Sequence, residues 1–165
     1  MRRITPDEWD LLRELRLRSL SDAPDAFGQR YDVAASEPVG EWQAAARASA
    51  AGDRRAWFIC RADDGTPVGL VQARRRPPSD CLLFSMWVAP EARRTGAGRA
   101  LVDAVRDWAR GWGADKVVLW VFGANEGAMR FYERISFQVV PEGADAESGR
   151  AFGALAMVSP VLGAS

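Results

Sequence analysis

Residues 82–137, LLFSMWVAPEARRTGAGRALVDAVRDWARGWGADKVVLWVFGANEGAMRFYERISF, decide the fold. The apolar run Leu82–Val88 predicts a strand, which Pro90 ends because proline has no backbone donor for a sheet ladder. Apolar residues then recur with helical spacing over Leu101–Ala109, which predicts an amphipathic helix. The next apolar run, Lys116–Phe122 (KVVLWVF), predicts a second buried strand. The order strand, helix, strand indicates a right-handed crossover between parallel neighbours.

The loop before that helix, Arg93–Arg99 (RRTGAGR), has the composition of an anion site. Glycine lets the backbone come close to a ligand, and a helix start offers unpaired N–H groups at the positive end of the helix dipole. The arginines add positive charge, so a phosphate or pyrophosphate is the expected ligand. A tight strand-to-helix turn with solvated arginines explains the same residues. The loop lacks the Gly-Lys-Ser/Thr of a Walker loop and the third glycine of the dinucleotide fingerprint.

Two motifs in this stretch resemble the signatures of the GNAT superfamily of acyl-CoA-dependent N-acetyltransferases. Arg93-x-x-Gly96-x-Gly98 resembles the first signature, and residues 125–137 (NEGAMRFYERISF) resemble the second, in the family's order and spacing. Ser136 departs from the second pattern, because glycine is usual before the phenylalanine. More loosely, residues 15–28 (LRLRSLSDAPDAFG) look like helix 1 and the following loop of one bacterial branch of the family.

The resemblance implies an α/β fold of the α+β type. A single mixed, mostly antiparallel sheet of six or seven strands is expected, flanked by about four helices. The fourth and fifth strands, Cys81–Val88 and Lys116–Phe122, would be parallel and splay apart. One domain over residues 1–165 is the expectation for a chain of this length.

The resemblance assigns the family's acetyl-CoA site to particular residues of this chain. Acetyl-CoA, as co-substrate, would place its pantetheine arm along the fourth strand and its pyrophosphate on the amides of the glycine loop. The expected cofactor-binding residues are Trp87, Val88, Arg93, Arg94, Thr95, Gly96, Ala97, Gly98, Arg99 and Asn125. Tyr132 matches the family's general acid, and a phenol with a pKa of about 10 can donate to a thiolate whose conjugate acid has a pKa of about 8.5. A ring at the edge of a helix is the structural alternative for Tyr132.

The acceptor site is less well defined by the sequence. Phe27 and Tyr31, in an expected loop over residues 21–36, either plug the core or line the acceptor pocket. The general base stays open among Asp80, Glu91, Glu126 and a water chain through Ser85.

The first functional expectation is acetyl transfer to the primary amine of a small molecule. Alternatives are an acetyltransferase for protein N-termini or lysines, a catalytically silent acyl-CoA sensor or scaffold, and an unrelated phosphate binder.

The composition argues against several other kinds of site and partner. The chain has no histidine, which excludes His-based triads and His metal sites, and no metal is expected. Its formal net charge of zero argues against nucleic-acid and anionic-membrane partners. Cys60 and Cys81 fall in apolar runs and are expected in the core. The N-terminus has no signal-peptide pattern and no segment is as long and apolar as a membrane span, so a cytoplasmic protein is expected. A monomer or a homodimer is expected.

Local patterns predict the remaining elements. A capping box over Thr5–Glu8 should start the first helix, and Pro24 should end it. Residues 36–51 should form a second helix. The other expected strands cover residues 2–4, 56–61, 68–73, 137–140 and 151–159, and polar loops are expected over residues 74–80 and 141–150. The three arginines at 74–76 could hold a ligand phosphate, but a solvated loop is the preferred explanation of a charge run.

Overall fold

The computed structural model describes residues 1–161 and contains one seven-stranded sheet with the order β1-β2-β3-β4-β5-β7-β6. The strands are β1 Arg2–Arg3, β2 Arg55–Arg61, β3 Pro67–Arg76, β4 Asp80–Val88, β5 Lys116–Phe122, β6 Gln138–Val139 and β7 Ala154–Pro160. The helices are α1 Trp9–Asp22, α2 Tyr31–Ala35, α3 Val39–Ala51, α4 Ala97–Gly111, α5 Glu126–Arg134 and α6 Ala144–Arg150. Of the neighbouring strands, β4 and β5 are parallel and the others antiparallel. This confirms the expected mixed, mostly antiparallel sheet.

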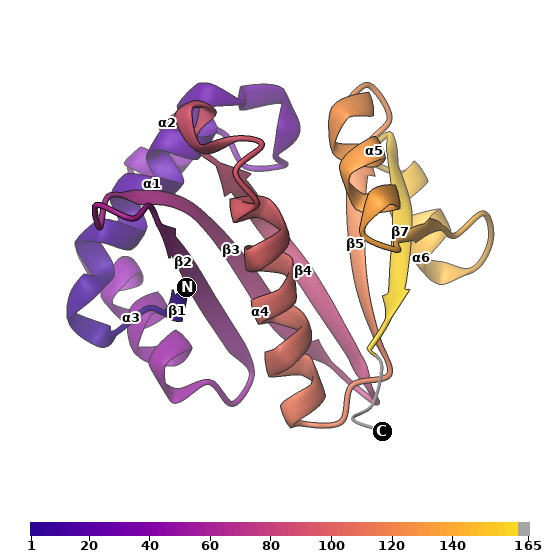
Figure 1. Cartoon of the computed structure of the whole chain (residues 1–165), viewed down its shortest axis with the longest axis horizontal. Coiled ribbons are helices and arrows are strands. Elements are labelled where there is room, and N and C mark those ends of the chain that lie inside the picture. The colour runs from indigo at the N-terminus through magenta and orange to yellow at the C-terminus, as the bar shows by residue number, and fades with distance from the viewer. Residues whose placement is uncertain (162–165) are drawn as a thin grey trace.

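Helices cover both faces of the sheet (Figure 1). The amphipathic α4 packs on β2, β3 and β4, with Leu101, Val102 and Val105 fully buried. Helices α1 and α3 pack against each other and contact β3 and β2 respectively. None of the helices in the described part of the chain has the length and apolar character needed to traverse a bilayer.

The parallel strands β4 and β5 are paired only at one end. Their register runs from Asp80–Lys116 to Leu82–Val118, and beyond it the strands diverge, as Figure 1 shows. A β-bulge lies in the half of β4 that is not paired with β5, where Ser85 and Met86 together oppose one residue of β3. Ser85 has a φ of 53°, an uncommon value for a residue with a side chain. Bulges bend a strand locally and leave one residue outside the ladder.

Charged side chains join the two halves of the sheet at the paired end. Arg76, at the end of β3, binds both carboxylate oxygens of Asp145 in α6, at 2.6 and 2.9 Å. The same guanidinium binds Asp80 of β4 at 2.6 Å. Lys116 of β5 lies 3.8 Å from Asp80. The closed end is therefore an ion cluster that connects β3 and β4 to β5 and α6.

Three loop predictions were wrong. Residues 21–36 contain α2, and residues 141–150 contain α6, so the described chain has six α-helices instead of about four. Neither helix carries a clear apolar stripe, and α6 is held by tertiary contacts such as the bond to Arg76. Strand β3 continues to Arg76 because the guanidiniums of Arg74 and Arg75 rest on the rings of Phe84 and Trp112.

Other local predictions were confirmed. The Thr5–Glu8 capping box is present and precedes α1, although its first turn is a 3-10 helix. Helix α3 ends at Gly52, which has a φ of 71°. Both cysteines are free and buried.

Candidate active site

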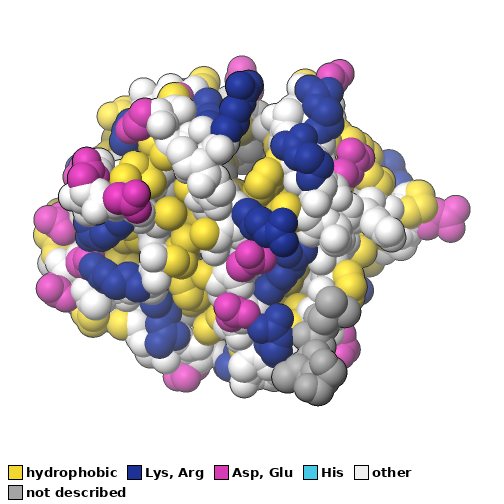
Figure 2. All heavy atoms as spheres, viewed as in Figure 1, with side chains coloured by type: hydrophobic (Ala, Val, Ile, Leu, Met, Phe, Trp, Pro, Cys, Tyr) yellow, Lys and Arg dark blue, Asp and Glu magenta, His cyan; other side chains and the backbone are white. Residues whose placement is uncertain are grey.

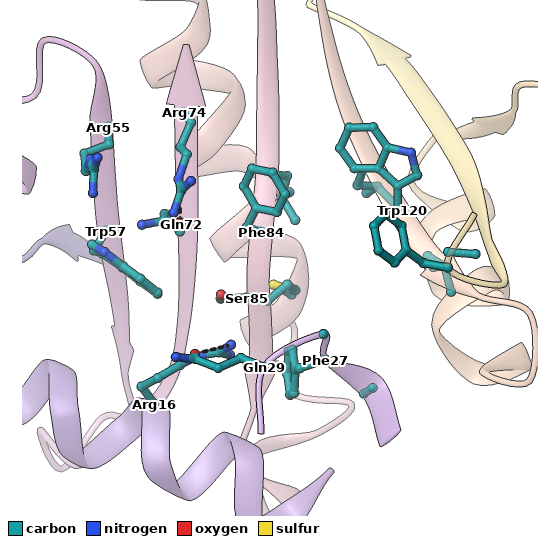
Figure 3. A pocket seen from close by; sticks show the side chains of 18 of the residues that line it. Arg16, Phe27, Gln29, Arg55, Trp57, Gln72, Arg74, Phe84, Ser85 and Trp120 are labelled. Atoms are coloured by element: carbon teal, nitrogen blue, oxygen red, sulfur yellow. Dashed lines mark hydrogen bonds between the residues drawn. The ribbon is translucent and has the colours of Figure 1, made fainter. Parts of the chain in front are cut away.

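The divergence of β4 and β5 opens a cleft of about 1230 Å³ (Figure 3). It is lined by α1, α3 and the segment between them, and by strands β2 to β5, with contributions from α5 and α6. Phe84 on β4 and Trp120 on β5 stack across the gap with ring centroids 6.1 Å apart. The bulge residues Ser85 and Met86 also line the cleft. A bulge leaves one residue outside the ladder, so its polar groups are available to a ligand.

Tyr132 reaches the same cleft from α5. Its side chain is 7% exposed, and its ring meets those of Phe131 and Phe137 edge to face, at 5.1 and 5.5 Å. Burial raises the pKa of the phenol, so it stays protonated at neutral pH. Asn125 also lines the cleft and caps α5, where its Oδ1 accepts from the amide of Ala128 at 3.1 Å. Helix α5 thus orients Asn125 and Tyr132, the two polar residues of the second motif that line the cleft.

The glycine loop has the backbone of an anion site. Helix α4 starts after Gly96, which has a φ of 91°, and no side chain caps the helix. Arg94 also has a positive φ, of 66°. Figure 2 shows basic side chains on both sides of the notch above α4. Uncapped amides at a helix start attract anions, and nearby arginines strengthen this attraction.

Gly98 has a packing role that the motif did not reveal. A Cβ built on it would lie 3.1 Å from the ring of Phe131 and 3.4 Å from the terminal methyl of Met86. The glycine therefore lets α4 approach α5 and the bulge of β4 closely. A Cβ built on Gly96, by contrast, would meet no atom of the described chain within 4 Å. Glycine is therefore favoured at this position by the left-handed backbone and not by close packing.

Arg93 connects the glycine loop to the end of α1 and to the end of β4. Its guanidinium contacts the carboxylate of Asp22 at the end of α1, and its Nε donates to the carbonyl of Val88 at 3.1 Å. The same Asp22 oxygen accepts from Nε1 of Trp87 at 2.9 Å. The hydrogen bond from Trp87, followed by that from Arg93, lowers the pKa of Asp22. Trp87 is 4% exposed, so packing explains its ring, and any contact with a ligand there would come from the backbone.

The structure brings some of the predicted residues together and leaves others apart. Those that line the cleft are Phe27, Ser85, Asn125 and Tyr132. Tyr31 is 49% exposed and lines a separate hollow of about 350 Å³ beside Asp22. The remaining predicted residues, at the end of β4 and in the glycine loop, lie outside the cleft lining.

The carboxylates considered as bases are also outside the cleft lining. Asp80 sits in the ion cluster at the closed end. Glu91 pairs with Arg18, and Glu126 pairs with Arg130 on the surface of α5.

Several cleft residues were missed by the sequence patterns. The missed polar residues are Arg16, Gln29, Arg30, Glu37, Glu41, Arg55, Gln72 and Ser148, and Arg74 also lines the cleft. Alternation along β2 and β3 places Arg55 and Arg74 on one face, but the sequence does not show which face meets the cleft. Arg74 lies in the segment predicted as a solvated loop.

The chain belongs to the acetyltransferase (GNAT) family, whose pattern it matches over residues 10–137. An uncharacterized N-acetyltransferase of Mycobacterium tuberculosis is 36% identical over 86 residues, 52% of this chain and 54% of that protein. The chain spans about half the length of the curated relatives it matches.

Solved structures show the same fold. A GNAT-family acetyltransferase from Staphylococcus aureus aligns over 98% of both chains with a TM-score of 0.75 and 14% identity. The PaiA N-acetyltransferase of Thermoplasma acidophilum, solved in complex with coenzyme A, aligns over 96% of both chains with a TM-score of 0.71 and 15% identity.

Proposed function

We propose that this protein transfers an acetyl group from acetyl-CoA to the primary amine of a small molecule, with Tyr132 as general acid. The observation that carries the proposal is the cleft between β4 and β5, lined by both the bulge at Ser85 and the phenol of Tyr132. A thioester held at this point would have backbone donors on one side and a proton donor on the other.

The residues present suit acetyl-CoA. The uncapped start of α4 after Gly96 offers amides to a pyrophosphate, and exposed Arg94 and Arg99 add charge. The splayed strand β4 offers backbone groups to an extended pantetheine arm, since within residues 1–161 its pairing with β5 ends at Leu82. Bound there, acetyl-CoA supplies the activated acyl group.

Three groups of the chain would then act on the reaction. Backbone amides near the bulge stabilise the negative charge that develops on the thioester oxygen. The Tyr132 phenol, kept neutral by burial, donates its proton or a hydrogen bond to the leaving thiolate. A base removes the amine proton, because an amine with a pKa of about 10.4 is mostly protonated at pH 7 and its deprotonation costs about 4–5 kcal/mol.

We assign the base to Glu41. Within the described chain, Glu37 and Glu41 are the carboxylates that line the cleft. Glu37 accepts a hydrogen bond of 2.8 Å from Gln29, which engages one of its oxygens. Glu41 makes no ion pair with the residues that the structure describes, so its carboxylate is available to a substrate amine or to a bridging water.

The test is a direct assay. The purified protein is titrated with CoA by calorimetry, and acetyl-CoA turnover is followed by thiol release and by mass spectrometry of an amine panel. Binding together with an acetylated amine is expected. Binding without turnover of any amine would support the silent sensor, and absence of CoA binding would contradict the proposal. Glu41→Gln should shift the rise of activity with pH to a higher pH, whereas Glu91→Gln, a surface control, should not.

A further inference from the structure

Three arginines line the cleft without a carboxylate partner (Figure 3). They are Arg16 of α1, Arg55 of β2 and Arg74 of β3. None of them forms an ion pair with a carboxylate within residues 1–161. The fourth arginine of the cleft lining, Arg30, pairs with Asp32. Unpaired guanidiniums in a concave site are a feature of oxyanion recognition.

Arg55 and Arg74 form the clearest anion site. They are direct partners in the pairing of β2 with β3, so both side chains lie on the same face of the sheet. Nε of Arg74 donates to Oε1 of Gln72 at 2.9 Å, and its guanidinium lies 5.1 Å from the centroid of the Phe84 ring. Burial, and then the charge of Arg55, lower the pKa of Arg74. Two like charges that repel each other are stabilised when an anion binds between them.

Arg16 adds positive charge to the helix side of the cleft. It is 6% exposed, and its contacts are neutral: Oε1 of Gln29 at 3.2 and 3.1 Å, and the ring of Phe27 at 4.8 Å. Glu37 accepts a hydrogen bond from Gln29 and acts on Arg16 through its charge, without forming an ion pair with it in the described chain. With Glu41, the cleft thus presents two carboxylates against three unpaired arginines. The arginine pair on the strands stays uncompensated.

The position of this pair fits a small acceptor. Arg74 pairs with Leu82 on β4, and Ser85 lies three residues further along. At a rise of about 3.3 Å per residue, the anion site and the reacting bulge are roughly 10 Å apart. Trp57 and Phe84 line the cleft on the same face, so the space between the two points has aromatic walls.

We propose that the acceptor is a primary amine that also carries a carboxylate or phosphate group, which Arg55 and Arg74 bind while an apolar body lies along Trp57 and Phe84. This inference rests on the proposed function and names the acceptor class of the same site. It separates the protein from acetyltransferases of polyamines such as spermidine, whose multiple positive charges would meet the arginine pair.

Four amines with the same phenylethyl body test the charge requirement. They are phenethylamine, 4-(2-aminoethyl)benzoate, tyramine phosphate and 4-(2-aminoethyl)benzylamine. The value of kcat/KM for the better anionic amine should exceed that for phenethylamine by at least about tenfold, which corresponds to 1.4 kcal/mol. The dicationic amine should fall below phenethylamine. Comparison of the benzoate with the phosphate identifies the oxyanion.

Variants locate the anion site. Arg55→Gln and Arg74→Gln should each lower the ratio of kcat/KM for the anionic amine over phenethylamine by about tenfold, mainly through KM. Arg75→Gln is the matched control, because it neutralises the next arginine on β3, whose guanidinium stacks on Trp112, the residue that follows α4. Arg75 lies on the opposite face of the sheet, so the variant should leave the ratio unchanged. Melting temperatures establish that all three variants are folded.

A binding measurement separates the two proposals. NMR titration with amine-free 4-ethylbenzoate and 4-ethylphenyl phosphate should show binding by the wild-type protein that Arg55→Gln and Arg74→Gln lose. The anion site would be contradicted by similar kcat/KM values for all four amines. It would also be contradicted if the variants left the ratio of kcat/KM for the anionic amine over phenethylamine unchanged. Either result would leave the proposed acetyltransferase function intact. Anion binding without turnover of any amine would overturn the proposed function and keep the site.

Discussion

The amide of Phe137 donates to the carbonyl of Tyr132 at 3.0 Å, and the rings of the two residues meet edge to face. The turn after α5 thus fixes both the backbone and the ring of Tyr132. It passes through Ser136, which has a φ of 72°, at the position where the family pattern has glycine. The placement of the proposed general acid depends on a turn that carries backbone strain.

Ser136→Gly should stabilise the protein. A side chain in the left-handed region costs about 1–2 kcal/mol, and the extra freedom of glycine in the unfolded chain offsets about half of it. We expect the free energy of unfolding to rise by about 0.5–1 kcal/mol, measured by urea denaturation. Ser21→Gly, in the last turn of α1, is the control and should lower stability by a few tenths of a kcal/mol. A loss of stability in Ser136→Gly would show that the hydroxyl compensates for the strain.

Tyr132→Phe should retain the fold and the affinity for CoA and slow the chemical step. Loss of a proton donor costs about 10²–10⁴-fold in rate, whereas the ring packing against Phe131 and Phe137 is kept. Single-turnover acetylation must be measured, because slow product release can hide a chemical defect. Equal single-turnover rates for the two proteins across pH 6–9 would exclude the general-acid role.

Gly96→Val and Gly98→Val should each weaken CoA binding more than about tenfold, but for different reasons. The first forces a β-branched residue to a φ of 91° at the helix start, and the second pushes a side chain into Phe131. Calorimetry should therefore show that Gly98→Ala combined with Phe131→Leu recovers affinity relative to Gly98→Ala. Gly96→Val should gain nothing from the same second change. Unchanged CoA affinity in folded Gly96→Val would remove the pyrophosphate from this loop.

Asp22→Asn should destabilise the protein by about 1 kcal/mol at neutral pH, because it removes the charge that holds Arg93. The pKa of Asp22 is lowered in the folded state, so its stabilisation is complete above its ordinary pKa and is lost as the pH falls through the folded value. The stability difference between wild type and Asp22→Asn should therefore shrink on acidification below the ordinary pKa of 3.8. A difference that stays constant down to about pH 2 would contradict this linkage.

The sequence predicts the central part of the fold because residues 82–137 carry their own signals. The apolar runs, the helical stripe and the two linked motifs are local, and they place the glycine loop and Tyr132 in order along the chain. Helix α6 was not predicted, because it is stabilised by contacts with residues that are distant in the sequence, such as that between Asp145 and Arg76. Short helices without an apolar stripe have little local signal.

The acceptor side of the site was less predictable for a similar reason. Arg55 and Arg74 come together only through the register of β2 and β3, which depends on strand pairing rather than on local pattern. Glu41 reaches the cleft from α3 through the packing of that helix over the sheet. Pairs of residues that are distant in the sequence define this half of the site, whereas a contiguous motif defines the donor half.

The ion cluster at the closed end has a further consequence. Strands β4 and β5 are paired over only three residue pairs, and the ion pairs among Arg76, Asp80, Lys116 and Asp145 add polar contact at the same end. These ion pairs are partly exposed, so we expect added salt to weaken them. The contact between the two halves of the sheet should therefore depend on ionic strength through residues that lie outside the cleft lining.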